Sequence, residues 1–162
     1  MFNESLVSSN TNEWGTPQKL FEILNDEFHF TLDPCSNNEN YKTGKHYTIQ
    51  ENGLLQDWSG ERVYMNPPYG YETSKWIEKA FQESQKGAIV VCLIVARTDT
   101  SYWHDIIFKY AAQIRFIRGK IKFDGAKWNA PFASAIVIFD SKKYKEKLVY
   151  YNISINKIIK QT

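Results

Sequence analysis

The stretch Arg62-Val63-Tyr64-Met65-Asn66-Pro67-Pro68-Tyr69-Gly70 decides how the rest of the chain is interpreted. Its first four residues are typical of a short strand, and an Asn-Pro-Pro-Tyr segment closed by glycine follows directly. Two consecutive prolines fix two φ angles and remove two backbone donors, so the segment exposes carbonyl oxygens without competing N–H groups. Because a residue before proline is held extended, Asn66 stands out from the end of its strand with its side-chain oxygen free to accept a hydrogen bond.

These residues favour a site for a ligand that donates hydrogen bonds. The Asn66 oxygen and the Pro67 carbonyl can accept the two hydrogens of one amino group, and the Tyr69 ring offers a face on which a planar base can stack. Asn, Pro and Gly also dominate ordinary turns, so the segment by itself leaves a simple turn open.

Strand-like and helix-like segments alternate along the chain. Helices are predicted at 17–28, with Thr16 as cap and Pro17 at the first position, from Ser74 as cap to Gly87, and at 100–112, with Thr100 or Ser101 as cap. Strands are predicted at 30–32, 46–51, 62–65, 88–95, 114–117 and 133–139, with a possible short strand at 121–123 and either a strand or a helix at 148–159. The unbroken apolar run 88–95 is typical of a central parallel strand covered on both faces. We therefore expect an α/β fold: one Rossmann-like domain with a mostly parallel sheet, helices on both faces and a C-terminal antiparallel hairpin.

Length and composition narrow the class of protein. The 162 residues suffice for one domain, with 1–13 expected as a flexible leader and 14–162 as the domain. The net charge of +2 argues against a general polyanion binder, so any nucleic-acid contact must come from a local patch. Cys35 and Cys92 lack metal-ligand companions at suitable spacing, which favours reduced thiols and no metal site. No apolar run approaches 18 residues, so we expect no membrane segment and a cytoplasmic protein.

Polar residues follow several of the predicted strands. Asp33, Asp57 and Asn66 are expected at the ends of three successive strands, and Arg97-Thr98-Asp99 follows the central apolar strand. In open α/β sheets, ligands bind outside the carboxyl ends of the strands. We therefore expect these side chains to share one ligand-binding edge, although each aspartate is also a common turn or cap residue.

The Asn-Pro-Pro-Tyr segment after a strand resembles the catalytic motif of amino-group methyltransferases that use S-adenosylmethionine. The order of further motifs resembles the phage-type DNA N6-adenine methyltransferase family over residues 13 to 140. These motifs are Trp14-Gly15-Thr16-Pro17, Phe30-Thr31-Leu32-Asp33, Asn52-Gly53-Leu54-Leu55-Gln56-Asp57-Trp58, Asn66-Pro67-Pro68-Tyr69-Gly70, Ala96-Arg97-Thr98-Asp99-Thr100 and Ile114-Arg115-Phe116-Ile117-Arg118-Gly119.

The resemblance implies a set of site residues and S-adenosylmethionine as cofactor, with DNA as substrate and no metal. The catalytic residues are Asn66, Pro67, Pro68 and Tyr69. The cofactor-binding residues are Trp14, Thr16, Pro17, Asp33, Pro34, Cys35, Ser36, Asp57, Trp58 and Asn66. Apart from the resemblance, position near the predicted site edge or the late hairpin makes Tyr69, Lys75, Arg97, Asp99, Arg118 and Lys120 the expected nucleic-acid-binding residues. The chain departs from the broader pattern at Asp33-Pro34-Cys35-Ser36-Asn37, where related cofactor loops carry glycines that permit close backbone approach.

Several alternatives stay open from the sequence. The same motif resembles that of enzymes acting on cytosine N4, RNA or protein glutamine, and a catalytically silent DNA- or partner-binding module can keep the same scaffold. A base inside a duplex cannot reach such a pocket, so the target has to flip out or be single-stranded. Phage or prophage origin is implied by the resemblance alone, and the sequence leaves monomer and homodimer undecided.

Overall fold

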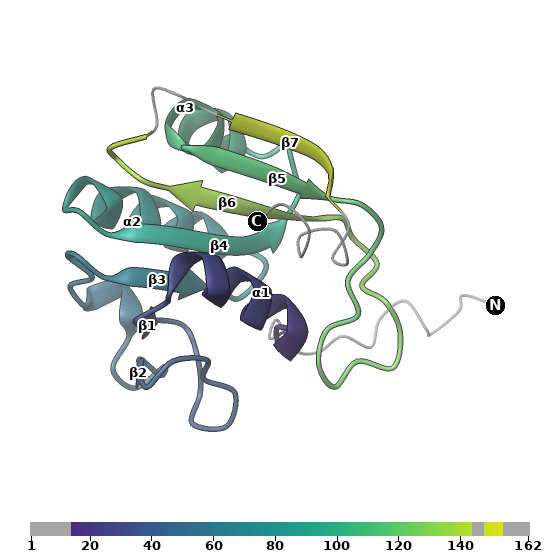
Figure 1. Ribbon diagram of the computed structural model, residues 1–162, viewed down its shortest axis with the longest axis horizontal. Helices are drawn as coiled ribbons and strands as arrows, with labels where there is room; N and C mark the ends of the chain where they lie inside the picture. Colours follow the sequence, from purple (N-terminus) through teal and green to yellow (C-terminus); the bar gives the residue numbers. More distant parts are fainter. Residues whose placement is uncertain (1–13, 144–147, 154–162) are drawn as a thin grey trace.

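The computed structural model describes residues 14–143 and 148–153 of the chain. The expected leader at 1–13 lies outside the described residues. The described part forms one sheet with helices packed on its two faces (Figure 1).

The strands of the sheet are ordered β2-β1-β3-β4-β6-β5-β7. Their bounds are β1 Leu32–Asp33, β2 Lys45–His46, β3 Arg62–Met65, β4 Ile89–Val95, β5 Gln113–Ile117, β6 Ser134–Phe139 and β7 Leu148–Ile153. Neighbouring strands are parallel except where β6 pairs with β4 and β5. The predicted mostly parallel sheet with an antiparallel pair near the C-terminus is confirmed.

The apolar run of β4 is the centre of the sheet, as predicted. Val90, Cys92 and Ile94 belong to one buried cluster, and Val91 and Leu93 belong to another. All five side chains are fully buried. Because alternate residues of a strand point to opposite faces, this segment supplies both cores of the molecule.

Helices cover both faces, as expected. Helix α1 (Gln18–Phe28) packs on one face, and α2 (Thr73–Gln85) packs on the other together with η3 (Trp103–Ile107). Figure 1 shows α1 crossing in front of the sheet, with α2 and α3 (Phe108–Tyr110) behind it.

The predicted helix caps are wrong. Pro17 occupies the N-cap position of α1, and the Thr16 hydroxyl bonds elsewhere. The Ser74 hydroxyl donates to the Tyr71 carbonyl, and the Thr100 hydroxyl donates to the Arg97 carbonyl, so neither accepts from a helical N–H group. In each case a nearby partner satisfies the hydroxyl better than the helix end does.

Several segment boundaries also differ from the expectation. The segment predicted as a strand at 46–51 pairs only at Lys45–His46, and 121–123 forms no strand. The helix expected at 100–112 contains a stretch of π-helix at 103–107. Of the ambiguous segment 148–159, residues 148–153 form a strand and 154–159 lie outside the described residues. Gly87 follows α2 with φ of 95°, as expected for a glycine that ends a helix.

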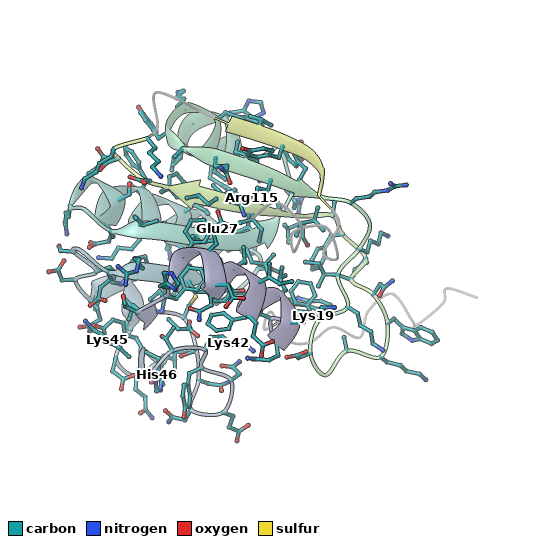
Figure 2. The ribbon with its side chains drawn as sticks, viewed as in Figure 1. Lys19, Glu27, Lys42, Lys45, His46 and Arg115 are labelled. Carbon is teal, nitrogen blue, oxygen red and sulfur yellow. The ribbon has the colours of Figure 1, made fainter. Side chains whose placement is uncertain are left out.

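One ion pair joins α1 to the far part of the sheet. Figure 2 shows Glu27 of α1 and Arg115 of β5 side by side, with Arg115 Nη1 2.8 Å and Nη2 2.5 Å from the two carboxylate oxygens. The Arg115 guanidinium also lies over the Phe28 ring at 5.6 Å. A bidentate pair of this kind fixes the orientation of the two elements as well as their proximity.

Cys35 and Cys92 are free thiols. Within residues 14–143 and 148–153, no cluster of His, Cys, Asp and Glu has the arrangement of a metal site. None of the helices in this part of the chain combines the length and apolar character needed to cross a bilayer.

Glu83 ties the C-terminal end of α2 to the loop before β3. Its carboxylate is almost fully buried and accepts from the Trp58 backbone N–H at 2.8 Å. It also pairs with Lys79 at 2.7 Å and with Lys86 at 2.8 Å. A buried carboxylate is tolerated because three donors surround it.

We expect Glu83→Ala to lower the free energy of unfolding by about 2–4 kcal/mol, because it leaves the buried Trp58 N–H without an acceptor and Lys79 without its partner. Urea unfolding followed by tryptophan fluorescence measures this loss. Glu78→Ala, an exposed position on the same helix, is the matched control and should change stability by less than about 0.5 kcal/mol. Equal effects of the two substitutions would contradict the assignment.

Candidate active site

A cleft of about 400 Å³ opens at the carboxyl ends of β1 and β3. This size lies within the range of small-molecule and cofactor sites. Its walls come from four segments of the chain, within 14–16, 33–42, 48–54 and 64–68, and from two residues at the start of α2. The lining residues are Trp14, Gly15, Thr16, Asp33, Pro34, Cys35, Ser36, Asn37, Asn40, Lys42, Thr48, Ile49, Asn52, Gly53, Leu54, Tyr64, Asn66, Pro67, Pro68, Glu72 and Trp76.

Asn66 is held at the end of β3 by hydrogen bonds from both ends of its amide. The Nδ2 group donates to the Trp14 carbonyl and to Thr16 Oγ1, the latter at 3.0 Å. A carbonyl oxygen only accepts, so it requires the NH₂ end of the amide to face Trp14. The Oδ1 atom therefore points away from the N-terminal segment.

Oδ1 accepts one hydrogen bond from the Tyr69 hydroxyl at 3.0 Å. An amide oxygen has two lone pairs, so one acceptor position remains. Pro67 and Pro68, which follow directly, also line the cleft and have no N–H groups of their own. Asn66, Pro67 and Pro68 thus share one part of the cleft wall at the end of β3.

The position of Asn66 depends in turn on a buried pair of hydroxyls. Thr16 Oγ1 and the Tyr64 hydroxyl lie 2.5 Å apart, and both residues are at most 2% exposed. Burial raises the pKa of the Tyr64 phenol well above its usual range, so this hydroxyl stays protonated. The pair joins the segment before α1 to the middle of the sheet, immediately beside Asn66.

The Tyr69 ring is not the exposed lid that the sequence suggested. It is 8% exposed and packs edge-on against Phe132, with centroids 5.5 Å apart. Phe123 contacts its other side at 6.3 Å. The segment after the prolines turns the ring toward an apolar cluster beneath the loop before β6, so Tyr69 supports Asn66 through its hydroxyl and does not line the cleft.

Asp33 is a buried carboxylate on the opposite wall, at the end of β1. Its side chain is 4% exposed, and Oδ2 accepts from the Lys42 backbone N–H at 3.0 Å. Burial raises the pKa of the Asp33 carboxyl to about 6, while the N–H groups of Lys42 and Cys35 offset part of this effect. The sequence placed Asp33 correctly at this edge.

The loop 33–37 after β1 has no glycine, but the turn that packs against it contains Gly53. A Cβ atom on Gly53 would lie 2.0 Å from the Pro34 carbonyl oxygen and 3.1 Å from the Trp76 ring. The turn 52–54 and the loop 33–37 can therefore approach this closely only because residue 53 is glycine. The preceding Asn52 has a positive φ and accepts from Leu54 N, which fixes the turn.

Three of the predicted cofactor residues do not line the cleft. The expectation that Asp57 ends a strand is wrong, because it follows the short helix η2 (Gly53–Leu55), and its carboxylate accepts from Ser59. Trp58 is fully buried and bonded to Glu83, which lies at the other end of α2 from the cleft. Pro17 forms the first turn of α1.

The sequence missed part of the cleft wall. Lys42, Thr48, Ile49 and Glu72 carried no motif, and Asn52, Gly53 and Leu54 belonged to a quoted motif without being assigned to the site. The remaining missed positions are Gly15, Asn37, Asn40, Tyr64 and Trp76. The sequence feature that could have identified them is the long polar segment after Asp33, which runs along the same edge of the sheet as the predicted site.

The predicted nucleic-acid residues lie around this edge. Arg97 and Asp99 are exposed after β4, and Arg118 and Lys120 are exposed after β5. Because β3, β4 and β5 run in the same direction, these segments emerge on the same side of the sheet as Asn66. Lys75, in the first turn of α2, pairs with Glu72 of the cleft wall at 3.0 Å.

Comparison with known proteins identifies relatives of this chain. The family model described as DNA N-6-adenine-methyltransferase (Dam) matches residues 4–159. A DNA N-6-adenine-methyltransferase of Haemophilus phage HP1 (strain HP1c1) is 27% identical over 119 residues, which cover 72% of this chain and 68% of that protein. The described fold also resembles a crystal structure titled "a modification subunit of a putative type I restriction enzyme" from Vibrio vulnificus YJ016, with a TM-score of 0.56 and 11% identity. That match covers 91% of this chain, which spans about half of the subunit (48%).

We expect the stability of the protein to fall as Asp33 ionises. Its pKa in the folded state, about 6, lies above the ordinary value of 3.8, so the folded state binds the proton more tightly. The resulting stabilisation is complete below pH 4 and is lost as the pH rises through 6, on the order of 3 kcal/mol in total. Urea unfolding from pH 4 to pH 8 should show this loss in the wild type and not in Asp33→Asn. Parallel pH profiles for the two proteins would contradict it.

Proposed function

Because the chain belongs to the Dam family of DNA N-6-adenine-methyltransferases, we propose that it transfers the methyl group of S-adenosylmethionine to the N6 amino group of adenine in DNA. The single observation that carries the proposal is the fixed orientation of the Asn66 amide, a residue of the cleft wall whose oxygen keeps one free lone pair. The enzyme would act in the cytoplasm of a bacterial host that carries the phage or prophage.

The cleft suits the cofactor on chemical grounds. It combines the Asp33 carboxylate, which can accept from ribose hydroxyls or face an ammonium group, with the apolar surfaces of Ile49, Leu54 and Trp76, on which an adenine ring can pack. Its volume of about 400 Å³ is sufficient for a molecule of this size. When bound, S-adenosylmethionine supplies an electrophilic methyl group on a sulfonium.

Asn66 and the prolines act on the other reactant, the target amine. The N6 lone pair of adenine is delocalised into the ring, which makes the nitrogen a weak nucleophile. The free lone pair of Asn66 Oδ1 and the Pro67 carbonyl accept the two N6 hydrogens and favour a more pyramidal nitrogen. The N6 lone pair forms the new N–C bond as the bond between sulfur and the methyl carbon breaks, the sulfur departs as a neutral thioether, and the surplus N6 proton leaves to solvent, because neither carbonyl oxygen is a base. Orientation and electrostatic stabilisation supply the rate enhancement, so the chain needs no covalent nucleophile.

The target base reaches this site only outside the DNA stack. Pro68, which is partly exposed at the cleft, offers an apolar surface beside the Asn66 oxygen. Tyr69 keeps its proposed catalytic role in this scheme by holding Oδ1 through its hydroxyl, and contact of its ring with the base requires it to leave the Phe132 packing. Arg97, Asp99 and Lys75 surround the same edge and are proposed to contact the DNA backbone or the flipped nucleotide.

The purified protein should transfer tritiated methyl groups from the cofactor to adenine-containing duplex DNA, with N6-methyladenine recovered after hydrolysis. Asn66→Ala should lower kcat by at least about 100-fold, because the acceptor of the N6 hydrogens is removed, while cofactor affinity measured by calorimetry changes little. Asn38→Ala, an exposed position outside this cleft, is the control.

Other outcomes distinguish the competing functions. Label recovered in cytosine N4, in RNA or in a protein glutamine would reassign the acceptor while keeping the chemistry. Cofactor binding without transfer to any of these acceptors would favour a catalytically silent binding module. Near-normal turnover of Asn66→Ala would remove the proposed role of that side chain.

Thr16 should act as a positioning residue for Asn66. Thr16→Val keeps the shape of the side chain but removes the hydroxyl that accepts from Asn66 and bonds Tyr64, so we expect kcat to fall about 10-fold or more at saturating cofactor and DNA. Thr16→Ser should restore most of the activity. A purely structural role would lower the melting temperature without this change in kcat, and equal kcat values in Thr16→Val and wild type would overturn the assignment.

A further inference from the structure

The segment between β5 and β6 forms an exposed basic loop, defined here as residues 118–130. In Figure 1 it extends beyond the carboxyl edge of the sheet. Its four basic side chains and its one acidic side chain, Asp124, are all exposed, which gives a net charge of +3 (four minus one) over 13 residues. The basic residues are Arg118, Lys120, Lys122 and Lys127. The whole chain carries only +2, so positive charge is concentrated here.

The charge of the basic loop is not neutralised by the described residues. Lys45, Lys75, Lys79 and Lys86 elsewhere in the molecule each pair with a carboxylate. Within residues 14–143 and 148–153, no carboxylate lies within ion-pair distance of the four basic side chains of the loop. Asp124 instead lies 3.9 Å from Lys42, a residue of the cleft wall. The loop therefore offers several cations to an external anion.

Trp128 at the tip of the basic loop is exposed. Its side chain is 74% exposed, whereas Trp58, Trp76 and Trp103 are all at most 7% exposed. The ammonium group of Lys127 lies 5.4 Å from its ring. A large aromatic surface left in water beside several cations matches ligands that combine negative charge with flat aromatic groups.

The base of the basic loop is well anchored. Ile121, Phe123 and Ala130 are at most 2% exposed, and Ala130 N donates to the Ile121 carbonyl at 2.8 Å. The loop is thus a supported projection whose polar and aromatic tips face solvent while its apolar side chains join the core beneath α1.

This anchor also fixes the basic loop beside the cleft. Asp124 N donates to the Gly15 carbonyl at 2.8 Å, and the Phe123 ring packs on Trp14 at 5.4 Å. Gly15 and Trp14 both line the cleft, and the Trp14 carbonyl holds Asn66. The loop and the candidate methyl-acceptor site are therefore joined through one short segment of backbone.

We propose that the basic loop is the element that docks on DNA beside the target base, with its lysines on the phosphates and Trp128 stacked on a base next to the flipped nucleotide. This inference rests on the proposed function, because it assumes that DNA enters the cleft at Asn66. The lysines supply salt-dependent affinity. When the target base leaves the stack, the face of its neighbouring base is exposed, and the Trp128 ring stacks on that face.

Binding of wild-type protein to a fluorescein-labelled duplex, measured by anisotropy without cofactor, tests the role of the lysines. Lys120→Ala/Lys122→Ala should weaken binding at least about 10-fold and lower the slope of log K against log salt by roughly one for each phosphate that the variant no longer neutralises. Lys142→Ala/Lys143→Ala removes the same charge from an exposed pair beyond β6, at the opposite edge of the sheet, and should change affinity far less. Equal effects of the two double variants on affinity would overturn the proposal.

Trp128 is tested by a matched pair of substitutions. Trp128→Ala should weaken duplex binding at least about fivefold, and Trp128→Phe should retain most of the affinity because a phenyl ring still stacks. DNA should quench the tryptophan fluorescence of the wild type. It should leave the tryptophan fluorescence of Trp128→Phe unchanged. Unchanged affinity in Trp128→Ala, or tighter binding of wild type to RNA of the same sequence, would overturn the assignment of this loop to DNA.

The same variants separate this inference from the proposed function. Loop variants that bind S-adenosylmethionine normally but show a raised KM for duplex DNA support both. A wild-type protein that binds duplex through the loop but transfers no methyl group supports the loop and removes the proposed function. If methyl transfer to DNA is insensitive to all loop substitutions, the proposed function is supported and the proposed role of the basic loop is contradicted.

Discussion

The structure depends on the hydrogen bonds that join the Trp14–Thr16 segment to the end of β3. The Trp14 carbonyl and the Thr16 hydroxyl both accept from the Asn66 amide, and Thr16 bonds the buried Tyr64 hydroxyl. Since a carbonyl accepts only, the amide has one allowed orientation, with its oxygen turned away from Trp14 and accepting from the Tyr69 hydroxyl. The same contacts join the start of α1 to the sheet, so the packing of this layer and the geometry of the site depend on the same hydrogen bonds.

The cleft illustrates how a close backbone approach can be achieved from the opposite side. The loop after β1 contains no glycine between Asp33 and Asn37, yet its Pro34 carbonyl lies against a neighbouring turn. Gly53 in that turn provides the missing space. Two backbones can approach this closely only if one of them lacks a Cβ atom. Here the residue without a Cβ is Gly53, which lies 19 positions after Pro34.

The two edges of the sheet have different properties. At the amino edge, the Glu83 carboxylate pairs with Lys79 and Lys86 and accepts from the Trp58 N–H, and these contacts stabilise the fold. At the carboxyl edge, Asp33 is buried with its pKa raised, and the cations of the basic loop have no carboxylate partners among the described residues. The carboxyl edge therefore combines a buried carboxylate of raised pKa with an exposed group of cations, both within reach of a ligand at the strand ends.

Local sequence was enough to establish the alternation of elements, the central strand, and the placement of Asp33 and Asn66 at strand ends, because periodicity and proline geometry fix these features. It also supported the family through the order of its motifs. Asp57 bonds Ser59 two positions along, which is the turn role that the sequence had left open. Packing in three dimensions was needed to turn Tyr69 inward to Phe132 and to bond Thr16 to Tyr64 instead of a helix end. These partners lie 63 and 48 residues away, and short-range sequence patterns do not specify which distant partner a side chain will meet.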